Sequence, residues 1–229
     1  MINDAADNAF AAFAEGFAGG TPQLVSRELV ADTQTPVSAY LRLALGSRNT
    51  FLLESVEGGE IRGRFSVIGL SPDLIWRCRG RVAEINRDPA KSGEFSADSR
   101  APIESLRALM AESAMADTGD LPPMSAGLFG YFGYDMIRHI EAITDANPAV
   151  IDTPDSMLVR PSLIAIFDRL KDSITFVVQV RPAEWDEPQT AWNHAQDRIA
   201  AALDALDAPM PPTEAGESTA PLPNPRSNM

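Results

Sequence analysis

The chain has 229 residues, a hydrophobic content of 45% and a formal net charge of −13. This length suits one large domain or two small ones, and the apolar content is sufficient for a buried core. The negative charge argues against nucleic acids and anionic membranes as partners, because both attract basic surfaces. No stretch approaches the roughly 20 apolar residues of a membrane helix, and the N-terminus lacks a basic, apolar leader. We therefore expect a cytoplasmic protein.

Cysteine and histidine usage argues against catalytic or metal chemistry in this chain. The single cysteine, Cys78, cannot form an internal disulfide, and it alternates with apolar neighbours as a core residue does. Neither His139 nor His194 stands in a CxxC or HExxH spacing. We expect no catalytic residue and no metal ligand here.

The first 45 residues predict a helix, a strand and a second helix. Three phenylalanines at three- and four-residue spacing place a helix over 3–17, which ends at a pair of glycines. Residues 24–32 alternate as a strand does. Thr35-Pro36 then provides a hydroxyl cap followed by proline at the first helical position, which predicts a helix over 37–45.

Short strands dominate the middle of the chain. Turn residues separate four candidates, and strands so close in sequence must pair as antiparallel hairpins; the candidates are 49–56, 63–70, 73–80 and 81–87. A helix over 102–114 and a glycine-spaced strand over 126–135 follow, and the strand leads into the short helical pattern MIRHIE.

The C-terminal part predicts a hairpin, a helix and a linker. Residues 162–180 contain two β-rich runs around a polar turn, and 185–206 has one apolar helical face. Residues 208–229 have linker composition, rich in Pro, Ser and Thr. We expect one α+β domain over 1–207, in which antiparallel, sandwich-like β-sheets are flanked by helices.

The motif GLFGYFG (127–133) is not a phosphate loop. It matches neither the G-x-G-x-x-G nor the P-loop spacing, and it contains large aromatic residues and no lysine. Glycine in a strand typically allows a close backbone approach, with aromatic rings packed over it. We expect that structural role.

The stretch FLLES (51–55) ends an apolar run with Glu54 and Ser55. The carboxylate of Glu54 can hold an ammonium group, the Ser55 hydroxyl can form a hydrogen bond, and Arg64 can bind a carboxylate. With an apolar wall beside them, these are the groups that an amino-acid ligand requires. A strand that merely reaches the surface would explain the same residues.

Four stretches together resemble anthranilate synthase component I, the large subunit that makes anthranilate from chorismate. They are TPVSAYLRL (35–43), FLLESVEGGEIRGRFSVIGLSPDLIW (51–76), GLFGYFGYDMIRHIE (127–141) and SLIAIFDRLKDSITFVV (162–178). The family's large subunit is about twice as long as this chain. Its C-terminal half holds the chorismate site, the Mg²⁺ ligands and the catalytic groups. The resemblance thus implies an N-terminal segment that is inactive alone, with 208–229 leading toward a missing chorismate-binding domain.

The resemblance also implies a regulatory role for the LLES strand. In the family this strand lines the feedback site for L-tryptophan, so Leu53, Glu54 and Ser55 would contact the inhibitor, and Arg64 would stand near the same site. A glutamine amidotransferase subunit would be the partner that supplies ammonia to chorismate. Bound tryptophan would favour a less active arrangement of the domains.

Three alternatives stay open at this stage. Component I of aminodeoxychorismate synthase shares the fold and the tryptophan-like pocket, although the GRFS-x-IG and YFGYD motifs favour anthranilate synthase; salicylate and isochorismate synthases often lack the LLES pattern. A stand-alone, non-catalytic ligand-binding domain would have a disordered proline-rich tail. A segment that folds poorly without its other half would expose apolar patches.

Overall fold

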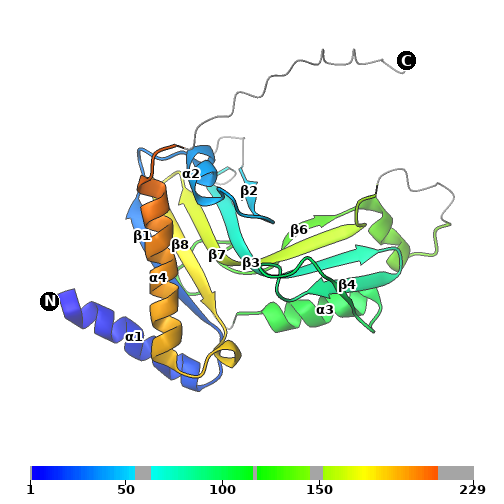
Figure 1. Cartoon of the computed structure of the whole chain (residues 1–229), viewed down its shortest axis with the longest axis horizontal. Helices are drawn as coiled ribbons and strands as arrows, with labels where there is room; N and C mark the ends of the chain where they lie inside the picture. The colour runs from blue at the N-terminus through cyan, green and yellow to red at the C-terminus, as the bar shows by residue number, and fades with distance from the viewer. Residues whose placement is uncertain (1, 55–62, 116–117, 145–151, 211–229) are drawn as a thin grey trace, which may run out of the picture.

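The computed structural model describes residues 2–54, 63–115, 118–144 and 152–210 (Figure 1). It confirms the α+β class and the antiparallel pairing, and all eight strands join one sheet. The helices are α1 (Ile2–Ala18), α2 (Pro36–Leu43), α3 (Pro102–Ser113) and α4 (Pro188–Asp207), with 3₁₀ helices η1 (Tyr134–His139) and η2 (Pro182–Glu184). The strands are β1 (Gln23–Val30), β2 (Phe51–Leu53), β3 (Phe65–Arg79), β4 (Val82–Asn86), β5 (Ser96–Ala97), β6 (Phe129–Phe132), β7 (Ser156–Asp168) and β8 (Ser173–Val180).

The long strands β3 and β7 form the spine of the sheet, and their neighbours change along their length. Near the β7–β8 turn, the order is β1-β8-β7-β3-β2. At the other end of the spine, β6 replaces β8 beside β7, β4 replaces β2 beside β3, and β5 pairs with the outer edge of β4. The sheet therefore has two halves that share only β3 and β7.

A β-bulge in β3 separates the two halves and corrects one expectation. The turn expected at Ser71-Pro72 is wrong, because β3 continues through it and pairs with β7 on both sides. The register shifts between Pro72 and Leu74, so that Asp73 is the extra residue. Pro72 faces Pro161 of β7 there, and proline suits this position because a bulge does not need every backbone N–H.

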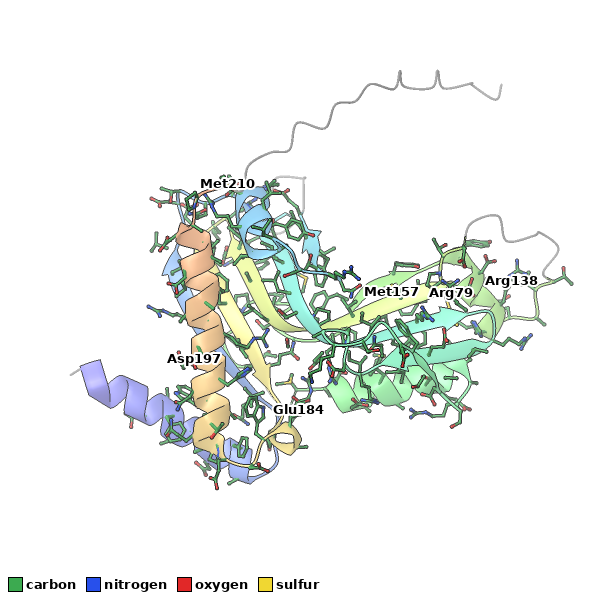
Figure 2. The ribbon with its side chains drawn as sticks, in the orientation of Figure 1. Arg79, Arg138, Met157, Glu184, Asp197 and Met210 are labelled. Carbon is green, nitrogen blue, oxygen red and sulfur yellow. The ribbon has the colours of Figure 1, made fainter. Side chains whose placement is uncertain are left out.

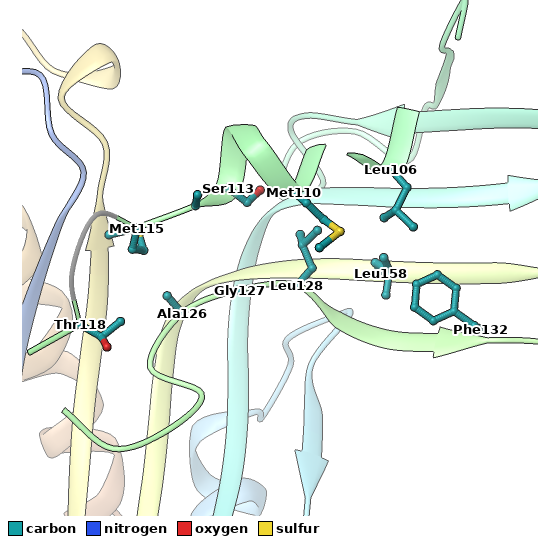
Figure 3. Close-up of a pocket in the computed structure, with 11 residues that line it drawn as sticks. Leu106, Met110, Ser113, Met115, Thr118, Ala126, Gly127, Leu128, Phe132 and Leu158 are labelled. Carbon is teal, nitrogen blue, oxygen red and sulfur yellow. The ribbon is translucent and has the colours of Figure 1, made fainter. Parts of the chain in front are cut away.

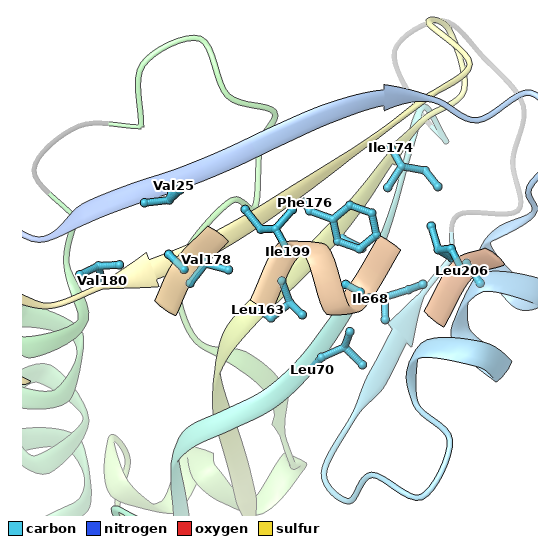
Figure 4. Packing of buried hydrophobic residues seen from close by; sticks show 14 of the residues in the cluster. Val25, Ile68, Leu70, Leu163, Ile174, Phe176, Val178, Val180, Ile199 and Leu206 are labelled. Carbon is cyan, nitrogen blue, oxygen red and sulfur yellow. The ribbon is translucent and has the colours of Figure 1, made fainter. Parts of the chain in front are cut away.

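Helices cover one face of both halves. Helices α1, α2 and α4 pack on the first half around Phe176, Ile199 and Leu206 (Figure 4). Helix α3 covers the second half, where Trp76 is fully buried and donates its indole N–H to Ser105 at 3.0 Å. Alternation along the strands places every second apolar side chain against these helices.

The opposite face carries one apolar cluster that runs across both halves. It contains Val67, Ile164 and Val177 from the first half, and Ile75 and Val159 from the second. The sheet bends so that β2 and β6 flank the hollow side of this face (Figure 1). Among the described residues, no helix contributes to this cluster.

Most of the other expected elements are confirmed, with different lengths. The Thr35 hydroxyl accepts from the Ser38 N–H, and the Ser38 hydroxyl accepts from the Thr35 N–H, both at 3.1 Å, which completes a capping box on α2. Strands β2 and β6 are shorter than expected, and β5 was not expected. Only 208–210 of the expected linker lie within the described residues, so the linker and the 1–207 boundary stay predictions.

Candidate functional site

A cavity of about 300 Å³ lies on the helix-free face beside Leu53, and we call it the Leu53 cavity. Three strands supply its apolar wall: β2 with Phe51 and Leu53, β6 with Phe129 and Tyr131, and β7 with Met157 and Val159. This volume is at the lower end of the range for small-molecule sites. The cavity brings together two motifs from the sequence, the LLES strand and the glycine-spaced aromatic strand.

Aromatic rings join β2 to β6 across the hollow side of the sheet. The rings of Phe51 and Phe129 stack with centroids 5.0 Å apart, although the two strands belong to different halves of the sheet. Gly69 of β3 lies opposite Phe51, and a Cβ atom at Gly69 would overlap the Phe51 ring. The absence of a side chain at Gly69 therefore allows Phe51 to lie across β3 and form one wall of the cavity.

Gly130 allows the other wall to form. A Cβ atom at this position would collide with the carbonyl oxygen of Met157 on β7. The structural role expected for the GLFGYFG motif is thus confirmed, since glycine permits close strand approach and aromatic residues flank it. Tyr131 donates its hydroxyl to the carbonyl of Pro154 at 2.9 Å and remains 43% exposed.

Glu54 follows Leu53 directly, at the end of β2. Its Oε1 accepts from Nη2 of Arg169 at 3.1 Å, across a sequence separation of 115 residues. Both side chains are partly exposed, so water screens this ion pair. The Glu54 carboxylate therefore stands at the edge of the apolar strand, where an incoming ammonium group can share it with Arg169.

Arg64 forms a fork-like ion pair with Asp168 at the end of β7. Its Nε and Nη2 donate to the two carboxylate oxygens at 2.8 and 2.6 Å, and the Asp168 side chain is 5% exposed. The Arg64 guanidinium lowers the pKa of Asp168, and the Leu170 N–H, which donates at 3.0 Å, lowers it further. A ligand carboxylate at Arg64 would have to share the guanidinium with Asp168.

The four expected site residues thus have different outcomes. Leu53 lines the cavity, Glu54 and Arg64 lie near the same end of β2 and β3 with ion-pair partners of their own, and Ser55 lies outside the described residues. The assignment of these residues to a tryptophan site stays a prediction.

The sequence pattern did not indicate that Phe51, Phe129 and Met157 line this cavity or that Arg169 pairs with Glu54. The signal for Phe129 was present in the glycine-spaced aromatic motif, which was assigned only a packing role. Met157 and Arg169 are brought to this region because β7 pairs with β3, a strand far away in the sequence, and no local pattern shows that contact.

A second cavity of about 400 Å³ lies between α3 and the segment that leads into β6 (Figure 3). Leu106 and Met110 of α3 face Leu128 and Phe132 across it. None of the described residues that line it is ionisable.

The remaining chemical candidates are structural. Cys78 is buried as expected, and burial raises the pKa of its thiol to about 11, which keeps it protonated. The described residues contain no group of three His, Cys, Asp or Glu side chains that could hold a metal ion. Within the same residues, no helix is long and apolar enough to cross a membrane.

Comparison with known proteins agrees with the motif resemblance. The chain is 44% identical to anthranilate synthase component 1 of Cereibacter sphaeroides over 203 residues. It is 35% identical to the corresponding protein of Pseudomonas putida over 187 residues and 34% identical to that of Thermus thermophilus over 166 residues. These matches cover 88%, 81% and 72% of this chain. No protein-family model matches it.

This chain is related to part of anthranilate synthase component 1. It spans 41%, 36% and 34% of the length of these three relatives, which is consistent with an N-terminal region. The fold agrees as well, since the crystal structure of anthranilate synthase component I from Streptococcus pneumoniae matches with a TM-score of 0.54 and 23% identity. That match covers 80% of this chain and 37% of the solved one.

Proposed function

We propose that this chain is the tryptophan-sensing part of an anthranilate synthase component I, and that the Leu53 cavity is its effector site. The observation that supports the proposal is the apolar cavity, whose wall includes Leu53, the residue that directly precedes Glu54 in the chain. A zwitterionic amino acid with a large apolar side chain requires that combination.

In the proposed complex, the indole ring lies among the side chains of Phe51, Phe129 and Met157. The ammonium group approaches Glu54, and the carboxylate approaches Arg64 or Arg169, the two arginines at this end of the sheet. The Phe51–Phe129 stack connects the two halves of the sheet. A ligand that fills the cavity therefore contacts both halves at once and can favour one arrangement of the intact protein over another.

The intact protein, in this proposal, converts chorismate and ammonia into anthranilate and pyruvate in the cytoplasm, as a lyase of tryptophan biosynthesis. A glutamine amidotransferase subunit supplies the ammonia. The resemblance implies that the catalytic site and its Mg²⁺ ligands lie in the C-terminal half of the family's large subunit, and this chain spans 41% of the Cereibacter sphaeroides relative. This chain alone would then lack synthase activity.

Isothermal titration of L-tryptophan into the purified protein tests the effector site. We expect saturable binding that Ser55→Phe weakens by about tenfold or more. The family resemblance implies that Ser55 contacts the inhibitor, and a ring that crowds the bound ligand costs about 1–3 kcal/mol. In the intact enzyme the same change would relieve inhibition by tryptophan. The matched control is Ser26→Phe, on the exposed side of β1 at the far edge of the sheet.

A second variant tests the ammonium contact. Glu54→Gln is expected to weaken the binding of L-tryptophan by about tenfold, since a hydrogen bond to a charged group contributes about 1.5–3 kcal/mol. It should leave the affinity for indole-3-propionate unchanged, because that compound has no ammonium group. If both variants bind L-tryptophan as the parent does, the effector site is elsewhere.

A further inference from the structure

A cleft of about 650 Å³ opens on the helical side of the sheet, at the bulge between the two halves, and we call it the arginine cleft. Asp73 of β3, Glu112 of α3, Arg160 of β7 and Arg181 after β8 all line it. Glu184 of η2 also lines it, and Figure 2 shows this residue well away from Met157, which lines the Leu53 cavity. The two hollows are thus separate sites.

Arginines outnumber carboxylates in the ion-pair network of this cleft. Asp73 accepts from Arg160 at 2.7 Å and from Arg181 at 3.2 Å. Glu112 accepts from Arg160 at 3.3 Å and from both terminal nitrogens of Arg87 at 2.7 and 2.8 Å. Three arginines therefore share two carboxylates, in a protein whose overall charge is −13.

Two of these arginines are almost completely buried. The exposed fraction is 4% for Arg160 and 8% for Arg181. Buried charges are normally paired and their donors satisfied. Arg181 donates to Gln179 at 2.9 Å and to Asp73, but its Nε is buried with no hydrogen-bond partner among the described residues. Asp88, Glu184 and Lys91 also line the cleft, so its charges are balanced overall. What this place lacks, within the described part of the chain, is a hydrogen-bond acceptor for the buried Nε of Arg181.

We propose that the arginine cleft binds a small oxyanion ligand, such as a phosphate- or dicarboxylate-bearing metabolite. An oxyanion would supply acceptors for the guanidinium donors, which bind phosphate and carboxylate groups in the same fork-like manner. The cleft is large enough for a ligand of this kind, and it joins α3 and η2 to both long strands. The proposal does not depend on the tryptophan site.

The cleft rim offers two charge changes that do not disturb the core. Glu184 is exposed, and the Lys91 side chain is 84% exposed and pairs with Asp88 at 3.0 Å. Removing the negative charge of Glu184 should strengthen the binding of an anion, whereas removing the positive charge of Lys91 should weaken that binding. Each effect is expected to reach about fivefold, the upper range for exposed charge pairs.

Calorimetric titration with inorganic phosphate and, separately, with succinate tests the proposal, with ionic strength held constant by sodium chloride. We expect saturable binding of at least one anion; phosphate alone would identify a phosphate site, and succinate alone a dicarboxylate site. Glu184→Gln should lower the dissociation constant and Lys91→Gln should raise it. Two controls make the same charge changes outside the cleft: Glu104→Gln, two turns before Glu112 on α3, and Lys171→Gln, in the distant β7–β8 turn. Both should leave the dissociation constant unchanged.

Two results would overturn the proposal. One is the absence of saturable binding for both anions. The other is a response of the two rim variants that matches their controls, because general charge effects alone would then account for any binding.

Discussion

The Leu53 cavity and the arginine cleft lie on opposite faces of the same two strands, and they are built in different ways. Apolar rings and two glycines shape the first, and a network of arginines and carboxylates shapes the second. β7 lines both hollows, whereas β3 lines the arginine cleft and carries Gly69 opposite Phe51 of the Leu53 cavity. A single bulge at Asp73 separates the half that carries β2 from the half that carries β4.

This difference determines how each hollow should respond to mutation. The shape of an apolar cavity depends on volume, so an added methyl group should alter it. A buried ionic network depends on charge balance, so the loss of one carboxylate should leave its arginines uncompensated. The following predictions test this contrast in order of expected effect.

The largest effect is expected for Asp73→Ala in the arginine cleft. Asp73 pairs with both Arg160 and Arg181, which keep their charges when the carboxylate is removed. We expect the free energy of unfolding to fall by about 3 kcal/mol, as measured by urea denaturation. The matched control is Asp152→Ala, whose side chain is 93% exposed and pairs with Arg79, and its change should stay within about 0.5 kcal/mol.

Adding phosphate to Asp73→Ala also tests the proposed oxyanion ligand. If an oxyanion occupies the cleft, it can partly replace the missing carboxylate, so phosphate should stabilise Asp73→Ala more than it stabilises the parent. An equal loss of stability in Asp73→Ala and Asp152→Ala would show that the network contributes no more than a surface ion pair.

A smaller effect is expected for Gly69→Ala beneath the Leu53 cavity. The new methyl group would overlap the Phe51 ring and displace it from β3 and from Phe129. We expect a loss of about 2 kcal/mol in the free energy of unfolding, within the range for overpacked sites, together with weaker tryptophan binding. Gly93→Ala is the control, because no atom lies within 4 Å of the added carbon. If Gly69→Ala is as stable as the parent and binds tryptophan equally well, the position of the Phe51 ring does not determine the function of the cavity.

Local sequence patterns predicted most elements but not the two hollows. The Thr35-Pro36 helix start, the hairpin over 162–180 and the α4 helix follow from side chains that are close in sequence, and each is confirmed. The expected turn at Ser71-Pro72 failed because proline is common both in turns and at bulges, and only the partner strand distinguishes the two.

The sites depend on contacts that are distant in sequence. Glu54 stood out because a carboxylate ends an apolar run, and Leu53 entered only through the family resemblance. Phe129 beside Leu53 and Arg169 beside Glu54 are brought in by β6 and by the end of β7. The arginine cleft gave no signal at all, since Asp73, Arg160 and Arg181 occur singly in unrelated stretches. Their meeting depends on the bulge, which itself was not predicted.

The smallest effect is expected for Arg64→Gln. The pH dependence of its stability distinguishes the ion pair of Arg64 with Asp168 from its contact with the Phe65 ring. The guanidinium of Arg64 lowers the folded-state pKa of Asp168 below its unfolded value of about 3.9. A depressed carboxyl pKa contributes stability above the unfolded value and loses that contribution as the pH falls through the folded value. Arg64→Gln brings the folded-state pKa of Asp168 closer to its unfolded value, so the variant has less of this stability to lose in acid. We therefore expect the loss in free energy of unfolding relative to the parent, measured by urea denaturation, to be larger at pH 6 than at pH 3.

The control is Arg107→Gln at an exposed position, which should show no such trend. A deficit that is constant with pH would mean that Arg64 stabilises the protein through its contact with the Phe65 ring, 4.8 Å away, rather than through Asp168. Arg64 would then be free to bind a ligand carboxylate without competition from that residue.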